Sequence, residues 1–295
     1  MVKPMDNILD ICDAHSIPLT IMFEVMEYIA FEKYDRQLVQ KLGYSPCSAI
    51  KEQMNTAYDK GHDIQLHIHP QFRDMAYDGK KFVLNEDIKH YIEWSQDEVK
   101  TVLGDGKETL ESMVNSKDYA CRALRLSDIG WRRAPKNTLV PMMELGLLVH
   151  TLCDQMPRGP RGYWDLGNGL YEIPIHSIPS SMLGMLNTRR LFLYPYIWFH
   201  TGIRTPGSKG KTGVNKKRSK WDLSKLTHKD MLKYLDAGRD RYDHHGYEVP
   251  LIMIGHTKDF FNQGNFDRFL KNIREDMGDE IRFQTLNNFI RENLL

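Results

Sequence analysis

The fold is decided by the stretch Lys60-Gly61-His62-Asp63-Ile64-Gln65-Leu66-His67-Ile68-His69-Pro70-Gln71-Phe72. Apolar and polar residues alternate from Ile64 to Ile68, and this period of two is typical of a β-strand. His67 and His69 therefore project from the same face of the strand. Because Pro70 cannot donate a ladder hydrogen bond, we expect the strand to end there, with both imidazoles at its carboxyl end.

Two imidazoles on one strand edge are typical of a divalent-metal site. Neutral imidazole is a common metal ligand, and a rigid strand presents both rings without having to order a loop. The alternative interpretation is a half-exposed strand that carries two histidines and no metal. The proline that follows the pair favours the metal interpretation.

Length and composition restrict the class of protein. At 295 residues the chain fits one large domain over 1–295, and a net charge of +1 gives no overall field that would attract nucleic acid. No hydrophobic signal core and no apolar run of membrane-spanning length are present. The four cysteines are far apart, which excludes a cysteine zinc site and a disulfide framework: Cys12, Cys47, Cys121 and Cys153. We therefore expect a soluble, cytoplasmic protein with reduced thiols.

Helices and strands are expected to alternate outward from the histidine strand. Periodicity and capping residues predict helices over 6–15, 26–42, 47–59, 85–115 with an interruption near 104–106, 137–146, 227–244, 266–277 and 285–293. Apolar runs predict strands over 19–25, 64–68, 119–124, 147–152, 169–175, 191–199, 249–254 and 281–283. This order implies parallel pairing and a single-domain α/β barrel. The alternation fails between 154 and 226, so we expect an insertion or cap at about 155–225.

The carboxyl ends of parallel barrel strands meet at one mouth. The predicted strand ends there are Glu24, His67, His69, Arg122, either His150 or Asp154, and His256. Two imidazoles and a carboxylate suit zinc, with cobalt, nickel or manganese as alternatives. Such a metal supports hydrolysis of an amide or ester, and His256 is the candidate general acid for the leaving group.

Several motifs in this order resemble the polysaccharide deacetylase (NodB-homology) family, carbohydrate esterase family four. The helix and strand over 8–25 resemble its leader helix and following strand, and Gly61 to Pro70 resembles its G-H-E-I-x-x-H…H-P metal motif in a shortened H-x-H-P form. Three later motifs resemble its F-R-x, L-x-H and F-x-T-L motifs: Cys121-Arg122-Ala123, Ile254-Gly255-His256 and Phe283-Gln284-Thr285-Leu286. The resemblance covers nearly the whole chain.

The resemblance implies a distorted (β/α)7 barrel that hydrolyses an N-acyl group, usually acetyl, from an amino sugar. It implies that His67 and His69 bind the metal, that His256 is the general acid and that Arg122 orients the catalytic carboxylate.

One family element is missing, namely the first strand ending in T-F-D-D-G, which carries the base and the third metal ligand. We expect that the chain is an N-terminally truncated form. Two alternatives stay open: Glu24 supplies the carboxylate, or the barrel binds sugar without catalysis.

The predicted insertion suggests the kind of substrate. Its aromatic residues, among them Trp198, are able to stack on sugar faces, although such residues also build cores. The basic run over 204–220 includes Lys216, Lys217 and Arg218 and is either a solvated loop or a phosphate clamp. Together they suit a nucleotide- or lipid-linked amino sugar of cell-envelope or O-antigen biosynthesis.

Two other functions compete with the deacetylase hypothesis. Amidohydrolase- and phosphoesterase-type hydrolases also use H-x-H, but they carry it on the first strand, whereas here it follows at least one strand. The second competing function is that of a catalytically degenerate carbohydrate-binding or scaffold protein with the same barrel fold. Bound metal discriminates the two classes, since a scaffold would hold none.

Overall fold

The histidine-bearing segment is a strand, β2 (Asp63–Ile68), in a six-stranded sheet. The computed structural model of the chain describes residues 2–84, 91–127, 134–151, 157, 159–179, 218–242, 248–278 and 280–295. The neighbours of β2 are β1 (Thr20–Glu24) and β5 (Ala123–Leu126), and both run parallel to it. Beyond them lie β6 (Val149–His150), β8 (Leu170–Glu172) and the antiparallel edge strand β7 (Trp164–Gly167).

Single parallel bridges continue the sheet past β8. Ile175 pairs with Ile252, and Asp222 pairs with Ile254. These bridges connect the sheet to the segment that precedes His256, as expected for a barrel. The predicted α/β class with a parallel, barrel-like sheet is therefore confirmed, whereas the single-domain boundary 1–295 stays a prediction.

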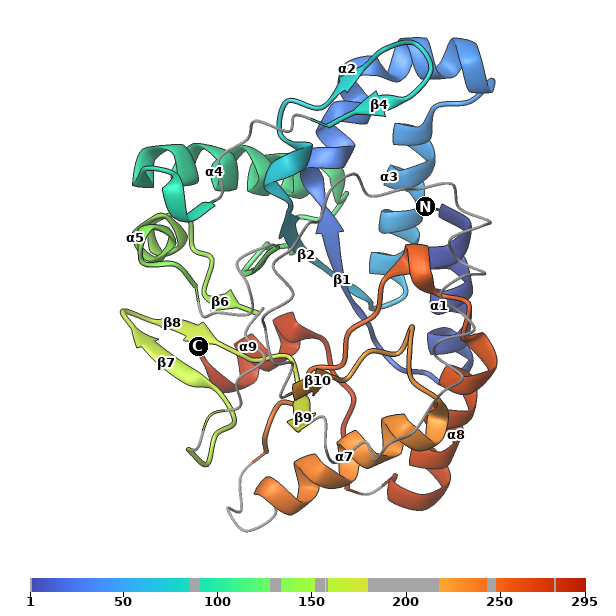
Figure 1. The fold of residues 1–295 in the computed structure, drawn as a ribbon, viewed down its shortest axis with the longest axis vertical. Coiled ribbons are helices and arrows are strands. Elements are labelled where there is room, and N and C mark those ends of the chain that lie inside the picture. The colour runs from blue at the N-terminus through green and yellow to red at the C-terminus, as the bar shows by residue number, and fades with distance from the viewer. Residues whose placement is uncertain are drawn as a thin grey trace.

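Helices cover the outside of this sheet (Figure 1). Their bounds are α1 Val2–Ala14, α2 Val25–Leu42, α3 Pro46–Asp59, α4 Gln96–Met113, α5 Lys136–Glu144, α7 His228–Tyr242, α8 Gln263–Met277 and α9 Leu286–Asn293. Short elements complete the described chain: the 3-10 turns η1 Pro70–Phe72, η2 Tyr91–Glu93 and η4 Thr257–Asp259, and the paired strands β3 Ala76–Tyr77 with β4 Phe82–Val83 and β9 Ser177–Pro179 with β10 Arg218–Lys220.

The alternation in β2 divides its side chains between two environments. Ile64, Leu66 and Ile68 are fully buried and pack with residues of α2, α3 and α4. His67 and Gln65 lie on the other face of the strand, which is the inner face of the sheet. Burial of the apolar face therefore fixes which way the histidine points.

Helix α9 closes the end of the sheet that is opposite the strand carboxyl ends. Its first backbone amides donate to side chains at the start of two strands, Leu286 to Thr20 Oγ1 at 2.8 Å and Asn287 to Asp63 Oδ2 at 3.1 Å. Phe289 and Ile290 of α9 pack in a buried cluster with residues of β5 and β6. The other end of the sheet is left for a site.

Several predicted elements differ from the structure. The chain is one continuous helix through the glycines at 104 and 106, residues 281–283 form no strand, and 249–254 pairs only through the bridges at Ile252 and Ile254. The strand predicted over 119–124 begins only at Ala123. The strand predicted over 191–199 and most of the 155–225 insertion lie outside the described residues.

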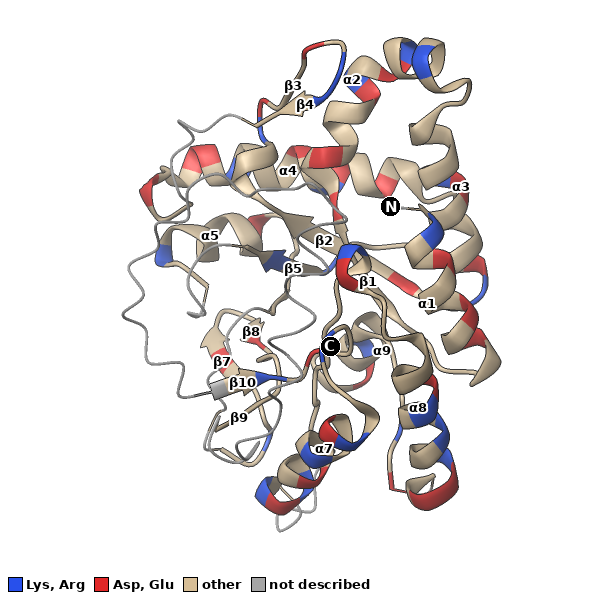
Figure 2. Cartoon of the chain, turned by 45° about the vertical axis from the view of Figure 1, so that its right-hand side comes forward, with Lys and Arg blue, Asp and Glu red and all other residues tan. Residues whose placement is uncertain are grey.

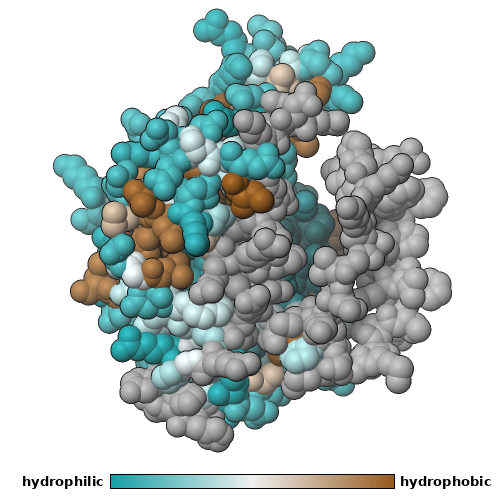
Figure 3. Space-filling view, turned by 60° about the vertical axis from the view of Figure 1, so that its left-hand side comes forward, coloured by the Kyte–Doolittle hydropathy of each residue, from teal (hydrophilic) through white to brown (hydrophobic). Residues whose placement is uncertain are grey.

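The described surface is mixed in character. Lys and Arg are interspersed with Asp and Glu on α1, α7 and α8 (Figure 2). Among the described residues visible in Figure 3, most are hydrophilic, and hydrophobic ones gather in a patch at the left side of the view. Among the described helices, none combines the length and the apolar character needed to cross a bilayer.

Candidate metal centre

The register of the parallel strands brings Glu24 and His67 side by side. Glu24 ends β1 and is the Cα partner of His67 on β2. It is also the N-cap of α2, where its carboxylate accepts a hydrogen bond from the amide of Met26 at 3.3 Å. The strand-to-helix junction therefore holds the Glu24 carboxylate beside the histidine strand.

Glu24, His67 and His69 together form a group able to hold a metal ion. One ligand atom from each lies within 4.8 Å of the other two. The rings of His67 and His69 are edge to face with centroids 4.5 Å apart, and Nδ1 of His69 is hydrogen-bonded to Glu24 Oε2. The donor set of two imidazoles and one carboxylate is that of many divalent-metal sites with open positions.

The tautomer of His67 suits a metal ligand. Its Nδ1 lies 2.6 Å from the carbonyl oxygen of Arg125, and since a carbonyl only accepts, Nδ1 carries the proton. The lone pair is then on Nε2, free for a cation. A backbone carbonyl that fixes the second nitrogen is the usual support for a metal-binding histidine.

The protonation states of the group follow from burial. Burial holds the pKa of His67 well below its ordinary value, and the charges of His69 and Arg125 act in the same direction, so the ring is neutral. Burial also raises the pKa of Glu24, and the hydrogen bond with His69 opposes this shift. Bound cation would favour the carboxylate form, so acid should weaken metal binding.

A second cluster lies across the mouth and consists of His256, Asp222 and Arg125. Asp222 Oδ2 is 3.9 Å from His256 Nδ1, and Asp222 Oδ1 accepts from the amide of Ser224 at 3.0 Å. The His256 amide donates to Ser224 Oγ at 2.8 Å, which ties the two segments together. Burial lowers the pKa of His256 to about 4, Arg125 acts in the same direction, and Asp222 opposes the shift.

Arg125 connects this cluster with the metal group. It is the Cα partner of His67, and its positive charge lowers the pKa of both His67 and His256. Burial lowers the pKa of Arg125 itself to about 10, and Asp222 opposes that change. The positive charge of Arg125 therefore acts on both a candidate ligand and the candidate proton-transfer residue.

Arg122 is not where the sequence predicted it. It precedes β5, and its Nη1 donates to Asn287 Oδ1 of α9 at 2.8 Å, at the opposite end of the strands. The expected strand-end position was wrong because β5 begins and ends later than 119–124. The arginine that lies at the mouth is Arg125.

Asp222 was not among the residues that the sequence indicated. It lies in the region where the helix–strand alternation fails, and its role depends on a single bridge to Ile254. No local pattern marks such a residue, so no signal in the sequence could have found it.

The remaining predicted residues are not brought to this centre. His150 lies on β6, fully buried, with Nδ1 2.6 Å from Glu172 Oε2. Arg218 begins β10, where it pairs with Pro179. Asp154, Trp198, Lys216 and Lys217 lie outside the described residues.

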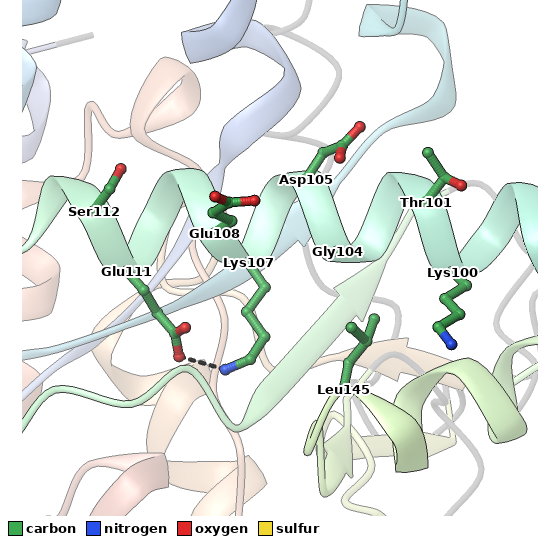
Figure 4. Close-up of a pocket in the computed structure, with 9 residues that line it drawn as sticks. All are labelled: Lys100, Thr101, Gly104, Asp105, Lys107, Glu108, Glu111, Ser112 and Leu145. Atoms are coloured by element: carbon green, nitrogen blue, oxygen red, sulfur yellow. Dashed lines mark hydrogen bonds and ion pairs between the residues drawn. The ribbon is translucent and has the colours of Figure 1, made fainter.

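A surface cavity of about 730 Å³ between α4 and α5 lies away from the centre (Figure 4). Lys107 and Glu111 of its lining form an ion pair, and Lys100 pairs at 2.8 Å with Glu144, which lies outside the lining. It contains none of the predicted site residues.

Comparison with solved structures places the fold. The structure resembles that of a protein from Mycobacterium smegmatis assigned to the polysaccharide deacetylases (TM-score 0.53, 15% identity). The similarity covers 98% of this chain and 76% of the Mycobacterium smegmatis chain. The structure also resembles the PuuE allantoinase (TM-score 0.52) and a protein from Pseudomonas aeruginosa PAO1 assigned to the polysaccharide deacetylases (TM-score 0.51), each at 14% identity over 99% of this chain and 74% of the other.

A scan against protein-family models found no match, and neither did a search of curated proteins. At these identities the structural similarities establish the fold alone, which is the α/β fold shared by these deacetylases and an allantoinase.

Proposed function

We propose that this protein is a metal-dependent carbohydrate N-deacylase, with acetylated amino sugars as the substrate class. The observation that carries the proposal is the group of Glu24, His67 and His69, whose ligand atoms lie within 4.8 Å of one another at the strand carboxyl ends. The neighbouring structures assigned to polysaccharide deacetylases support the substrate class.

In this proposal the three residues hold one divalent cation, zinc or alternatively cobalt, nickel or manganese. The donor set fits such an ion, because the Arg125 carbonyl leaves His67 Nε2 free and a carboxylate lies beside both rings. When bound, such an ion would supply polarisation of the acyl carbonyl and a lowered pKa of water.

His256 carries the proton in the proposed reaction. With a pKa of about 4 its imidazole is neutral at pH 7 and able to accept a proton from the attacking water. Asp222, 3.9 Å away, stabilises the imidazolium until the proton passes to the leaving nitrogen. The acyl carbon gains the water oxygen, the C–N bond breaks, and acetate and a free amine are the products.

The first experiment separates metal binding from turnover. Zinc content is measured after dialysis, and acetate release is measured with N-acetylglucosamine oligomers. Because an allantoinase shares the fold, ring opening of allantoin is measured as well. We expect His67→Ala to lose metal and activity. His256→Gln should keep the metal and lose about 10²–10⁴-fold in turnover.

His15→Gln is the matched control, because His15 pairs with Asp267 and belongs to neither cluster of the candidate centre. It should change neither metal content nor turnover. Metal binding that survives His67→Ala would contradict the proposed centre. A metal-loaded protein inert toward amino sugars and active on allantoin would replace the deacetylase assignment by a cyclic amidase.

We further propose that the amino sugar is linked to a diphosphate, as in nucleotide- or lipid-linked precursors of cell-envelope or O-antigen polysaccharide. The support is the run over 204–220, which is rich in Lys and Arg and contains no acid. Deleting residues 208–219 should weaken affinity for a nucleotide-linked amino sugar. Unchanged affinity would exclude this clamp.

A further inference from the structure

A second cavity, of about 480 Å³, lies where the start of α1, the turn η4 and the start of α8 meet. Its lining comes from three segments that are distant in sequence: Lys3, Pro4, Asn7, Thr257, Lys258, Phe260, Phe261, Gln263 and Gly264. Thr257 directly follows His256. The cavity therefore adjoins the candidate proton-transfer residue.

The charge of one lysine of the cavity acts on a carboxyl group that Glu24 and His69 of the metal group also influence. Lys258 acts on the carboxyl of Glu27, whose pKa is raised by burial and by Glu24 and is lowered by the charges of His69 and Lys258. Glu27 thus lies within electrostatic range of both the metal group and the cavity.

Phe261 is exposed although its loop is pinned. Its neighbour Phe260 is 3% exposed and packs edge to face on Phe266, with ring centroids 6.1 Å apart. On the other side, the Asn262 side chain donates to the carbonyl of Leu223 at 3.2 Å. Between these two anchors the Phe261 ring is 70% exposed, so a hydrophobic face is held out to solvent by a fixed backbone.

The cavity is positively charged. Its lining contains Lys3 and Lys258 and no acidic residue, and neither lysine forms an ion pair with any residue that the structure describes. Helix α8 begins here without an acid in its first turn and without a side-chain cap, and a Cβ on Gly264 would meet no atom within 4 Å. Backbone amides at the open helix start add to the attraction for an anion.

An aromatic face beside unpaired cations recognises a ring that carries negative charge. Phe261 is able to stack on the apolar face of a sugar, and the lysines are able to pair with a carboxylate or phosphate on it. We propose that this cavity binds an anionic saccharide unit next to the amino sugar that reacts. This inference rests on the proposed function for the identity of the neighbouring unit, but the binding itself does not require turnover.

The test is direct calorimetric titration of the full-length protein with three probes. They are N-acetylglucosamine 1-phosphate, a glucuronic acid–N-acetylglucosamine disaccharide and the neutral disaccharide N,N′-diacetylchitobiose. We expect at least one anionic probe to bind roughly tenfold or more tightly than the neutral one. Preference for the phosphate or for the uronate decides which anion the cavity takes.

Two variants locate the binding in the cavity. Lys258→Met should remove most of the preference for the anionic probe, and Phe261→Ala should weaken that probe about tenfold or more. Lys271→Met, on the exposed part of α8, and Tyr44→Ala, an aromatic residue that is 56% exposed elsewhere, are the matched controls and should leave binding unchanged.

Three results would each overturn the proposal. They are equal affinity for charged and neutral probes, affinities that neither variant changes, and no binding of an anionic probe up to about 10 mM. The two proposals fail separately. Anion preference that depends on Lys258 in a protein without deacylase activity would leave the cavity assigned and remove the proposed function, whereas deacylase activity without anion preference would do the reverse.

Discussion

At the scale of single residues, the ring of His67 is held by a neighbouring strand rather than by another side chain. Its Nδ1–H donates to the carbonyl of Arg125 because parallel pairing of β2 with β5 makes the two residues register partners. Gln65 lies two positions earlier, and its Oε1 accepts hydrogen bonds from the backbone amides of Arg122 and Ala123 at 2.8 and 2.7 Å. Polar residues on the inner face of β2 thus fix β5 at both ends.

His256 makes the stability of the metal-free protein depend on pH. Its folded-state pKa of about 4 lies below the ordinary 6.5, so between these values the unfolded chain binds a proton that the folded chain does not. This contribution to the free energy of unfolding is complete above pH 6.5 and is lost as the pH falls toward 4. Since the side chain is 41% exposed, the effect is smaller than full burial would give.

Urea denaturation at several pH values between neutral and the folded-state pKa checks this prediction. His256→Gln should show a shallower loss of stability across that range than the wild-type protein, because the group that titrates is gone. Tyr44→Ala, at a residue that is 56% exposed, is the control and should keep the wild-type slope. Parallel pH profiles for wild type and His256→Gln would show that His256 is not desolvated in the fold.

At the scale of elements, α4 shows why glycine does not always end a helix. Ser95 caps it with a reciprocal pair of bonds to Glu98, and the helix continues through Gly104 and Gly106 to Met113. Gly106 packs against the sheet, where an added Cβ would lie 3.0 Å from Val25 Cγ1 and 3.2 Å from Leu66 Cδ1. The glycine that looked like a break is a close contact between helix and strand.

The two glycines of α4 should respond oppositely to alanine. Gly104→Ala places its Cβ 3.8 Å from Leu145 Cδ2, an ordinary contact, so the better helix propensity should stabilise by about 0.5–1 kcal/mol. Gly106→Ala gains the same propensity but pushes on two fully buried side chains, so we expect a net loss of about 1–2 kcal/mol.

Chemical denaturation of both variants measures these changes, and each variant serves as the control for the other. Equal shifts for the two substitutions would mean that α4 does not pack on β2 as described.

At the scale of the whole molecule, the chain end completes the fold that the first strands begin. Helix α9 contacts Thr20, Asp63 and Arg122, which stand at the start of β1, at the start of β2 and just before β5. Its Phe289 and Ile290 are 4% and 0% exposed in the cluster formed with Ala123 and Val149. One short helix therefore covers the end of the sheet opposite the candidate metal centre.

Deleting residues 286–295 should prevent stable folding. It removes two buried side chains worth about 2–5 kcal/mol each and leaves Asp63 buried without the amide of Asn287, which together approach the stability of a typical domain. Circular dichroism and limited proteolysis report the outcome. Deleting only Leu295, which is 75% exposed, is the control and should be neutral. A ten-residue deletion that still unfolds cooperatively would contradict this role of α9.

Much of the fold could be predicted because its signals are local. The alternation in β2, the cap at Thr285 and the apolar run of β1 placed their strands and helix within a few residues of the observed bounds, whereas the helix predicted from residue 85 begins only at Gln96. Predictions failed where a boundary depended on partners elsewhere. The start of β5 is set by pairing with β6 and β2, and residues near 281–283 lack a strand partner among the described residues.

The sequence by itself determined that His67 and His69 share one face of a strand that ends at a proline, because the period of two is a property of the extended backbone. Only the tertiary structure decided which carboxylate and which positively charged side chain lie beside them. Glu24 and Arg125 are selected by parallel register, and Asp222 by a bridge to Ile254. Such pairings join residues that are dozens of positions apart through hydrogen bonds between strands, and nothing in the local sequence encodes them.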